Sequence, residues 1–167
     1  MEPSSPAYKI PESVLVVIHT AAFEVLLLDR ADQPGYWQSV TGSKDTEDEP
    51  LADTAIREVR EETGIIVERR HPPVAAPAES VGVDSLVDWR RSIRYEIYPQ
   101  WRHRYPPGIT RNMEHWFSLQ VPRNIVVTLN PREHLRFEWL PFEEAAARCF
   151  SPSNRDAILQ LPLHTAR

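Results

Sequence analysis

The chain has 167 residues, a formal net charge of -5 and a sequence pI near 5.7. This length suits one domain with a sizeable core, and the acidic balance argues against broad nucleic-acid binding, which needs a basic face. The sequence has no apolar run as long as a membrane span and no signal-peptide pattern at its start. A single cysteine, Cys149, excludes an internal disulfide. We therefore expect a cytoplasmic protein with no membrane or nucleic-acid partner.

The first part of the chain predicts three strands. Residues 1–11 are polar and hold three prolines, so most of them are expected to be loosely ordered. Residues 13–18 and 25–28 are short β-branched or aliphatic runs, which predict two buried strands paired as a hairpin. Residues 36–41 predict a third strand, which leads into a glycine-containing loop.

Residues 50–63 predict an amphipathic helix. Pro50 suits the first turn, because proline has no N–H group to lose there. Gly64 suits the position just past the end, where a left-handed backbone is cheap for glycine. Apolar residues recur at spacings of three and four and form one face of this helix. They are Leu51, Ala55, Ile56 and Val59.

The next part of the chain predicts two strands separated by a loop. Residues 65–68 read as a strand, and residues 71–88 are rich in proline and alanine, which indicates a surface loop. Residues 91–105 alternate for part of their length, which predicts a strand with one face in the core.

The last part of the chain predicts two strands and two helices. The strands are expected at residues 114–121 and 134–140, and the first helix at residues 142–150. Ser153 is the expected N-cap of a final helix that reaches about Leu161. A helix after the third strand and two near the end indicate an α/β/α sandwich around a mixed sheet, within a single domain.

Three carboxylates stand on one side of the predicted helix, because Glu58, Glu61 and Glu62 are spaced i, i+3 and i+4. Such a cluster repels itself, and a hard divalent cation such as Mg²⁺ would compensate for the repulsion. The alternative is a solvated acidic face balanced by Arg57 and Arg60. Spacing alone favours that alternative, since charge runs on helices are common.

Residues 57–65, Arg-Glu-Val-Arg-Glu-Glu-Thr-Gly-Ile, resemble the second half of the Nudix box, Gly-x5-Glu-x7-Arg-Glu-U-x-Glu-Glu-x-Gly-U, where U is apolar. The first half departs from the pattern, because six residues separate Gly42 from Glu49 instead of five. The extra residue precedes the helix, so the helical carboxylates keep their phase. Glu49, with Asp48 as the alternative, is the expected partner of Arg57 in holding the loop to the helix.

The Nudix resemblance implies an α/β/α fold and hydrolysis of a nucleoside diphosphate linked to another group, with Mg²⁺ as cofactor and Mn²⁺ as a substitute. It implies catalytic roles for Glu58, Glu61 and Glu62, and one of these carboxylates, or a distant one, would act as the base. It implies metal binding by Glu58, Glu62 and Glu133. The motif residues expected to have structural roles are Gly42, Glu49, Arg57 and Gly64.

Segments outside the box resemble the Nudix hydrolases of folate biosynthesis, which cleave dihydroneopterin triphosphate to the monophosphate and pyrophosphate. In order, these segments are 8–9, 37–43, 102–105, 107–108, 110–112, 133–135, 139–140 and 153–155. The loop at 71–88 is longer than in those proteins. By position, the resemblance implies that the substrate-binding residues are Lys9, Arg30, Thr41, Tyr95, Glu96, Ile97, Tyr98, His134 and Ser151.

Two other functions remain open. The first is a Nudix hydrolase of nucleoside triphosphates, such as an oxidised dGTP or dATP, or of dinucleoside polyphosphates; a pterin and a guanine share a hydrogen-bonding edge. The second is a Nudix-fold module that senses a nucleotide without cleaving it, and the intact Glu58, Glu61 and Glu62 count against this one. In every case the protein is expected to be a monomer.

Overall fold

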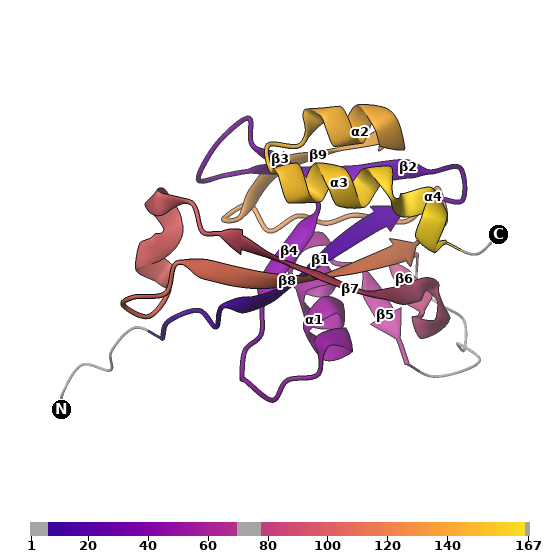
Figure 1. The fold of residues 1–167 in the computed structure, drawn as a ribbon. Coiled ribbons are helices and arrows are strands. Elements are labelled where there is room, and N and C mark those ends of the chain that lie inside the picture. Colours follow the sequence, from indigo (N-terminus) through magenta and orange to yellow (C-terminus); the bar gives the residue numbers. More distant parts are fainter. Residues whose placement is uncertain (1–6, 70–77, 166–167) are drawn as a thin grey trace.

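The structure is a computed structural model that describes residues 7–69 and 78–165. Within these ranges the strands are β1 (Glu12–His19), β2 (Glu24–Arg30), β3 (Trp37–Gln38), β4 (Val40–Ser43), β5 (Ile66–Glu68), β6 (Ser80–Gly82), β7 (Leu86–Glu96), β8 (Arg111–Gln120) and β9 (His134–Pro141). The helices are α1 (Leu51–Thr63), α2 (Phe142–Arg148), α3 (Pro152–Leu159) and α4 (Leu161–His164), and short 3-10 turns cover Val83–Ser85 and Pro99–Arg104 (Figure 1). None of these helices is long and apolar enough to cross a membrane.

The predicted mixed sheet is confirmed, and strand β1 is at its centre. This strand runs parallel to β8 along its whole length and antiparallel to β4 along its first half. The predicted β1–β2 hairpin is confirmed at its closed end, where His19 pairs with Val25. Beyond that point the two strands separate, because β2 pairs with β9 and β3 instead. The main sheet has the order β3-β2-β1-β8-β7, and β5 and β6 form a separate parallel pair.

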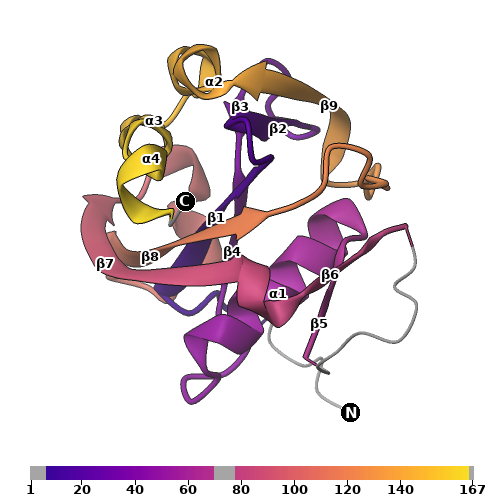
Figure 2. The same ribbon diagram turned by 90° about the vertical axis from the view of Figure 1, so that its right-hand side faces the viewer.

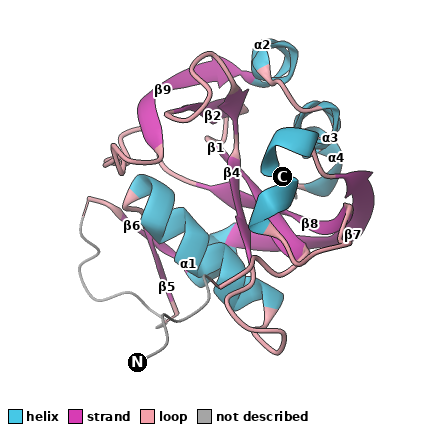
Figure 3. Cartoon of the chain, turned by 90° about the vertical axis from the view of Figure 1, so that its left-hand side faces the viewer, coloured by secondary structure: helices cyan, strands magenta, loops and turns pink. Residues whose placement is uncertain are grey.

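The continuous apolar run of β1 is explained by helices on both faces of the sheet. Val14 and Val16 pack with Val59 of α1 on one face, whereas Leu15 and Val17 belong to the core beneath the other helices. Figures 2 and 3 show α1 on one side of the sheet and α2, α3 and α4 on the other. The predicted α/β/α sandwich is therefore confirmed.

Helix α1 matches its prediction closely. Pro50, predicted in the first turn, is instead the N-cap residue just before it, with an extended backbone (φ -60°, ψ 141°), and Gly64 ends the helix in the left-handed conformation (φ 73°). The Gly64 N–H donates to the carbonyl oxygen of Arg60, which satisfies one of the free acceptors of the last turn. The three helical carboxylates therefore project from a helix whose two ends are well defined.

The predicted cap of the last helix was wrong. Ser151, not Ser153, is the N-cap of α3, and its side chain accepts a hydrogen bond from the Asn154 N–H. The physical reason is Pro152, which occupies the first helical position and therefore fixes the start of the helix. The helix itself ends at Leu159, and the separate short helix α4 follows.

Three other segments differ from their predictions. The strand expected at 36–41 is divided at Ser39, because β3 pairs with β2 whereas β4 pairs with β1. The strand expected at 91–105 starts earlier and ends at Glu96, and a 3-10 turn follows. Part of the loop expected at 71–88 lies outside the described residues. Its described part holds β6 and the start of β7, since β6 finds a parallel partner in β5.

Candidate active site

The glycine loop is fastened to α1 by Arg57. Its Nη2 donates to Glu49 Oε1 at 3.0 Å, and its Nε donates to Glu49 Oε2 at 3.2 Å. The same guanidinium donates to the Ser43 carbonyl oxygen and to Glu58 Oε1, both at 2.9 Å. The hydrogen bonds that Glu49 accepts from Arg57 lower the pKa of its carboxyl group to about 2. Glu49 is thus confirmed as the partner of Arg57, and Asp48 instead accepts from Thr46 Oγ1.

Gly42 lets the Glu58 carboxylate lie directly against strand β4. A Cβ atom added to Gly42 would stand 1.9 Å from Glu58 Cδ and 2.2 Å from Glu58 Oε1. Any larger residue would therefore push this carboxylate away from its position. The structural need for glycine here is a close approach of a side chain and not an unusual backbone angle.

The carboxylates of α1 meet the start of β9. One ligand atom each from Glu62, Glu133 and His134 lies within 4.8 Å of the others, and His134 Nε2 is 3.5 Å from Glu62 Oε1. Glu58 lines the same cavity, and the more exposed Glu61 lies at its side, 3.4 Å from Arg57 Nη1. The structure therefore brings the predicted metal ligands to one cavity and adds His134 to them.

This cluster fits a divalent cation. Glu62 Oε2 and His134 Nδ1 are buried without a hydrogen-bond partner among the described residues, and such groups are costly unless a ligand completes them. Burial, with the charge of Glu61, raises the pKa of Glu58 to about 7. Burial and the charges of Glu58 and Glu133 raise the pKa of Glu62. A hard cation with oxygen ligands would relieve both the repulsion and the lack of partners.

Cationic side chains line the cavity beside the carboxylates. Arg30 donates to both oxygens of Asp32 at 2.7 Å and to Gln38 Oε1 at 3.1 Å. Arg104 Nη2 lies 3.2 Å from Asp32 Oδ2, so one carboxylate orients two guanidinium groups. Lys9 is anchored by its backbone N–H, which donates to the Arg104 carbonyl oxygen at 2.8 Å. This arrangement can bind a polyanion next to the carboxylate cluster.

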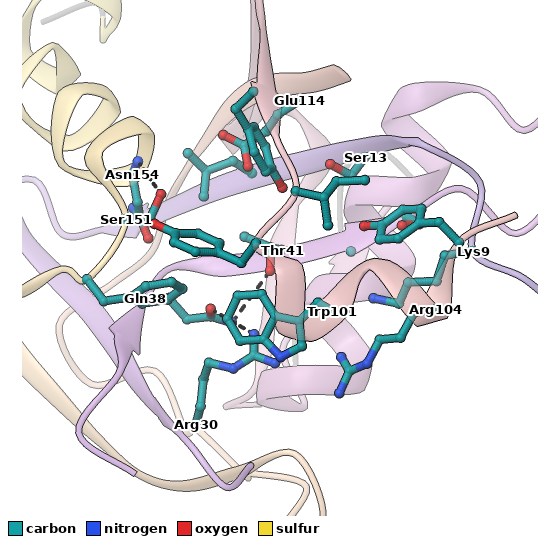
Figure 4. A pocket seen from close by; sticks show the side chains of 18 residues that line it. Lys9, Ser13, Arg30, Gln38, Thr41, Trp101, Arg104, Glu114, Ser151 and Asn154 are labelled. Atoms are coloured by element: carbon teal, nitrogen blue, oxygen red, sulfur yellow. Dashed lines mark hydrogen bonds between the residues drawn. The ribbon is translucent and has the colours of Figure 1, made fainter. Parts of the chain in front are cut away.

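A second, aromatic pocket opens from the same place. Its walls include Tyr95, Tyr98, Trp101 and Phe150 (Figure 4). Tyr98 and Trp101 meet edge to face with ring centroids 5.4 Å apart. The two cavities have a common border, which is formed by Lys9, Arg30, Gln38, Thr41, Gly42, Ser43 and Arg104. The site is therefore two-part, with an ionic end and the aromatic pocket.

Most of the predicted substrate-binding residues lie in this site. The ionic end takes Lys9, Arg30, Thr41 and His134, and the aromatic pocket takes Tyr95, Ile97, Tyr98 and Ser151. Glu96 differs from them, because its exposed side chain pairs with Arg111 Nε at 2.9 Å and does not line either cavity. The roles of these residues remain predictions.

The sequence analysis missed several residues that line the site. They are Gln38, Trp101, Arg104, Glu114, Phe150 and Asn154. The signal for Glu114 was present in the sequence, because it alternates along β8 with Asn112 and Trp116, and all three side chains are buried. A carboxylate at an inward position of a strand is unusual and should have been singled out.

Comparison with known proteins agrees with this geometry. The profile of the NUDIX domain matches residues 9–161. The chain is 44% identical over 162 residues to the dihydroneopterin triphosphate diphosphatase of Escherichia coli, covering 95% of this chain and 97% of that one. It is 38% identical over 152 residues to the protein of the same name from Haemophilus influenzae, covering 90% and 87%. The structure of the Escherichia coli dihydroneopterin triphosphate pyrophosphohydrolase matches with a TM-score of 0.78 and 40% identity, covering 95% of this chain and 99% of that chain. The chain belongs to the Nudix family of hydrolases.

Proposed function

We propose that this protein is a Mg²⁺-dependent pyrophosphohydrolase that converts dihydroneopterin triphosphate to dihydroneopterin monophosphate and pyrophosphate in folate biosynthesis. The observation that carries the proposal is the two-part site, in which a carboxylate cluster with neighbouring cations adjoins an aromatic pocket. The names of the relatives in Escherichia coli and Haemophilus influenzae support the same substrate.

The ionic end holds the triphosphate and the metal. Glu58, Glu62 and Glu133 are the proposed ligands of Mg²⁺, with Mn²⁺ as a substitute. A metal held by these carboxylates would neutralise phosphate charge and acidify a water molecule. Lys9 and Arg30 bind the phosphate oxygens. The Arg30 guanidinium has a fixed orientation because it donates hydrogen bonds to both carboxylate oxygens of Asp32.

Hydrolysis requires a base for the attacking water. The water oxygen forms a new bond to phosphorus, one P–O–P bridge breaks, and pyrophosphate leaves with the electron pair of that bridge. A carboxylate of Glu58, Glu61 or Glu62 takes the water proton. Arg57 supports this step indirectly, because its hydrogen bond to Glu58 Oε1 fixes that carboxylate against β4.

The aromatic pocket holds the ring of the substrate. The side chains of Tyr95, Tyr98 and Trp101 offer flat faces and edges to a bicyclic ring. The Arg30 guanidinium lies 4.5 Å from the centre of the Trp101 ring, so the aromatic pocket and the ionic end meet at this residue pair. A ligand with a flat ring joined to an anionic chain matches this arrangement.

A phosphate-release assay tests the proposal. Purified protein with Mg²⁺ is given dihydroneopterin triphosphate beside an oxidised dGTP, dATP and a dinucleoside polyphosphate, and pyrophosphate and orthophosphate are measured separately. We expect pyrophosphate to form fastest from the pterin. Faster release from a nucleotide would replace the pterin by that substrate, and binding without release from any of them would favour a nucleotide sensor. Omission of the metal is the control, and it should stop the reaction.

Two further expectations accompany the proposal. A monomeric protein should elute from a sizing column at a mass near 19.3 kDa. A role in folate biosynthesis would place the protein in the cytoplasm, and fractionation of the source cells tests that location.

A further inference from the structure

A buried carboxylate forms part of the wall of the aromatic pocket. Glu114 lies on β8, paired with Ser13 of β1 on one side and Ile93 of β7 on the other, and its exposed fraction is 4%. Its side chain lines the pocket together with Tyr95 and Phe150. In the view of Figure 4, Glu114 lies on the side of the pocket away from Arg30 and Arg104. The mechanism proposed above does not use this residue.

The carboxylate of Glu114 is held firmly but only on one oxygen. Trp116 Nε1 donates to Oε1 at 3.0 Å, and Ser153 Oγ donates to the same atom at 3.2 Å. Ser153 is itself 3.0 Å from the hydroxyl of Ser151. In the part of the chain that the structure describes, these are the hydrogen bonds that Glu114 accepts, and Oε2 takes no part in them.

Glu114 also lacks a cationic partner among the described residues. Among residues 7–69 and 78–165, no lysine, arginine or histidine forms an ion pair with it. Burial raises the pKa of this carboxyl group, and the hydrogen bonds from Trp116 and Ser153 oppose that rise. A buried carboxylate without a cation is costly to the fold. It is retained most readily where a ligand brings the missing N–H donors.

We propose that Glu114 is the specificity-determining residue of the site, and that its carboxylate accepts the ring N–H and the exocyclic amino group of a 2-amino-4-oxopyrimidine ring. This inference rests on the proposed function, since it assigns a role to a residue in the wall of the same aromatic pocket. The ring edge then lies at Glu114, and the triphosphate extends toward Lys9 and Arg30 at the other end of the pocket.

The chemistry of the ring edges explains the expected selectivity. A pterin and a guanine both offer two adjacent N–H donors, which match the two acceptor oxygens of a carboxylate. Adenine offers one donor beside one acceptor, so its ring nitrogen would face a carboxylate oxygen without a hydrogen. A site whose buried polar group is left unpaired by the wrong ligand discriminates strongly. Glu114 should therefore favour pterins and guanines over adenines.

The variant Glu114→Gln tests this inference with little change in shape. Glutamine keeps one acceptor oxygen for Trp116 and Ser153, but it replaces the second acceptor by an amide donor. A side-chain amide pairs with the donor–acceptor edge of adenine. The matched control is Glu138→Gln on β9, which removes a carboxylate that pairs with Arg148 at 2.8 Å and lies outside the linings of both cavities.

The ligands for the test are 7,8-dihydroneopterin, guanosine and adenosine, none of which carries phosphate. Their affinities are measured without metal by quenching of tryptophan fluorescence, since Trp101 lines the pocket. In Glu114→Gln we expect affinity for dihydroneopterin and guanosine to fall at least about tenfold, while affinity for adenosine is unchanged or higher. In Glu138→Gln all three affinities should equal those of the wild type.

The outcomes separate the inference from the proposed function. Unchanged dihydroneopterin binding in folded Glu114→Gln, or an equal loss for all three ligands, overturns the role of Glu114 and leaves the hydrolase proposal intact. Glu114-dependent dihydroneopterin binding in a protein that releases no pyrophosphate from its triphosphate supports the role of Glu114 and overturns the proposed reaction.

If Glu114→Gln does not fold, Glu114→Asp takes its place. Aspartate keeps both acceptors, so it should weaken dihydroneopterin binding but retain the preference over adenosine, and loss of that preference would count against the inference.

Discussion

Arg57 and Glu49 are joined by two hydrogen bonds, of 3.0 and 3.2 Å, that tie the loop before α1 to the helix itself. The same guanidinium reaches Glu58 Oε1 at 2.9 Å. One arginine therefore stabilises the loop and also orients a proposed metal ligand. These two effects are separable, because the first is measured by unfolding and the second by metal binding.

The variant Arg57→Ala should lower the free energy of unfolding by roughly 2 kcal/mol, because it removes several hydrogen bonds between charged groups. It should also weaken Mg²⁺ binding, since Glu58 loses its fixed orientation. Urea unfolding and a metal titration measure the two effects. Arg60→Ala, at an exposed position of the same helix, is the control and should change stability by less than about 0.5 kcal/mol. Equal stability of the two variants would contradict the structural role of Arg57.

The variant Gly42→Ala tests the close approach of Glu58 to β4. The added Cβ atom would overlap the Glu58 carboxylate, which must then move away from β4. Because this carboxylate ends a flexible side chain, we expect the fold to survive and turnover to fall at least about tenfold. Gly82→Ala is a matched control, since nothing lies within 4 Å of the Cβ atom that it would add. Full activity of Gly42→Ala would show that Glu58 need not lie against Gly42.

The sequence was sufficient to predict the elements that are defined by local signals. Helix α1 has a proline at its start, a glycine at its end and an apolar stripe between them, so its limits were predicted to within one residue. The continuous apolar run within β1 predicted a buried strand. Glu49 was the expected partner of Arg57, because the seven residues between them match the motif, although the extra loop residue left Asp48 as an alternative.

Features that depend on tertiary contacts were not predictable in the same way. Ser151 and Ser153 are both suitable caps, and the choice depends on Pro152 and on the Ser153 hydroxyl, which donates to Glu114 instead. The interruption at Ser39 arises because its N–H donates to Asn154 Oδ1, a residue far away in the sequence. The alternation along β8 indicated that Glu114 points inward, but it gave no sign that this side of the strand borders a pocket.

The metal-free protein should become less stable as the pH rises. The pKa of Glu58 is raised from its ordinary value of 4.5 to about 7. The folded protein therefore binds the Glu58 proton more tightly than the unfolded chain does. The resulting contribution to the free energy of unfolding is fully present below pH 4.5 and is lost as the pH rises through about 7. Urea unfolding with a chelator, at about pH 5 and about pH 8, measures the change.

Two comparisons isolate this effect of pH. Glu58→Gln should show a smaller loss of stability across the same range, because glutamine has no proton to lose. Saturating Mg²⁺ should remove or reverse the fall in the stability of the wild type with rising pH, because metal binding favours deprotonated ligands. If stability falls with pH by the same amount in the wild type with metal, in the wild type without metal and in Glu58→Gln, then Glu58 is not the origin of the pH dependence.

Glu62→Gln should separate stability from activity. The Glu62 side chain is buried, and the charges of Glu58 and Glu133 oppose its ionisation. Glutamine keeps the shape of the side chain and removes the charge, so the metal-free variant should unfold at a higher temperature than the wild type at about pH 8. Its turnover should nevertheless fall by at least about 100-fold, because the cluster loses a proposed metal ligand. Glu144→Gln, at an exposed position of α2, is the control and should change neither property. A Glu62→Gln enzyme with wild-type turnover would rule out Glu62 as an essential metal ligand.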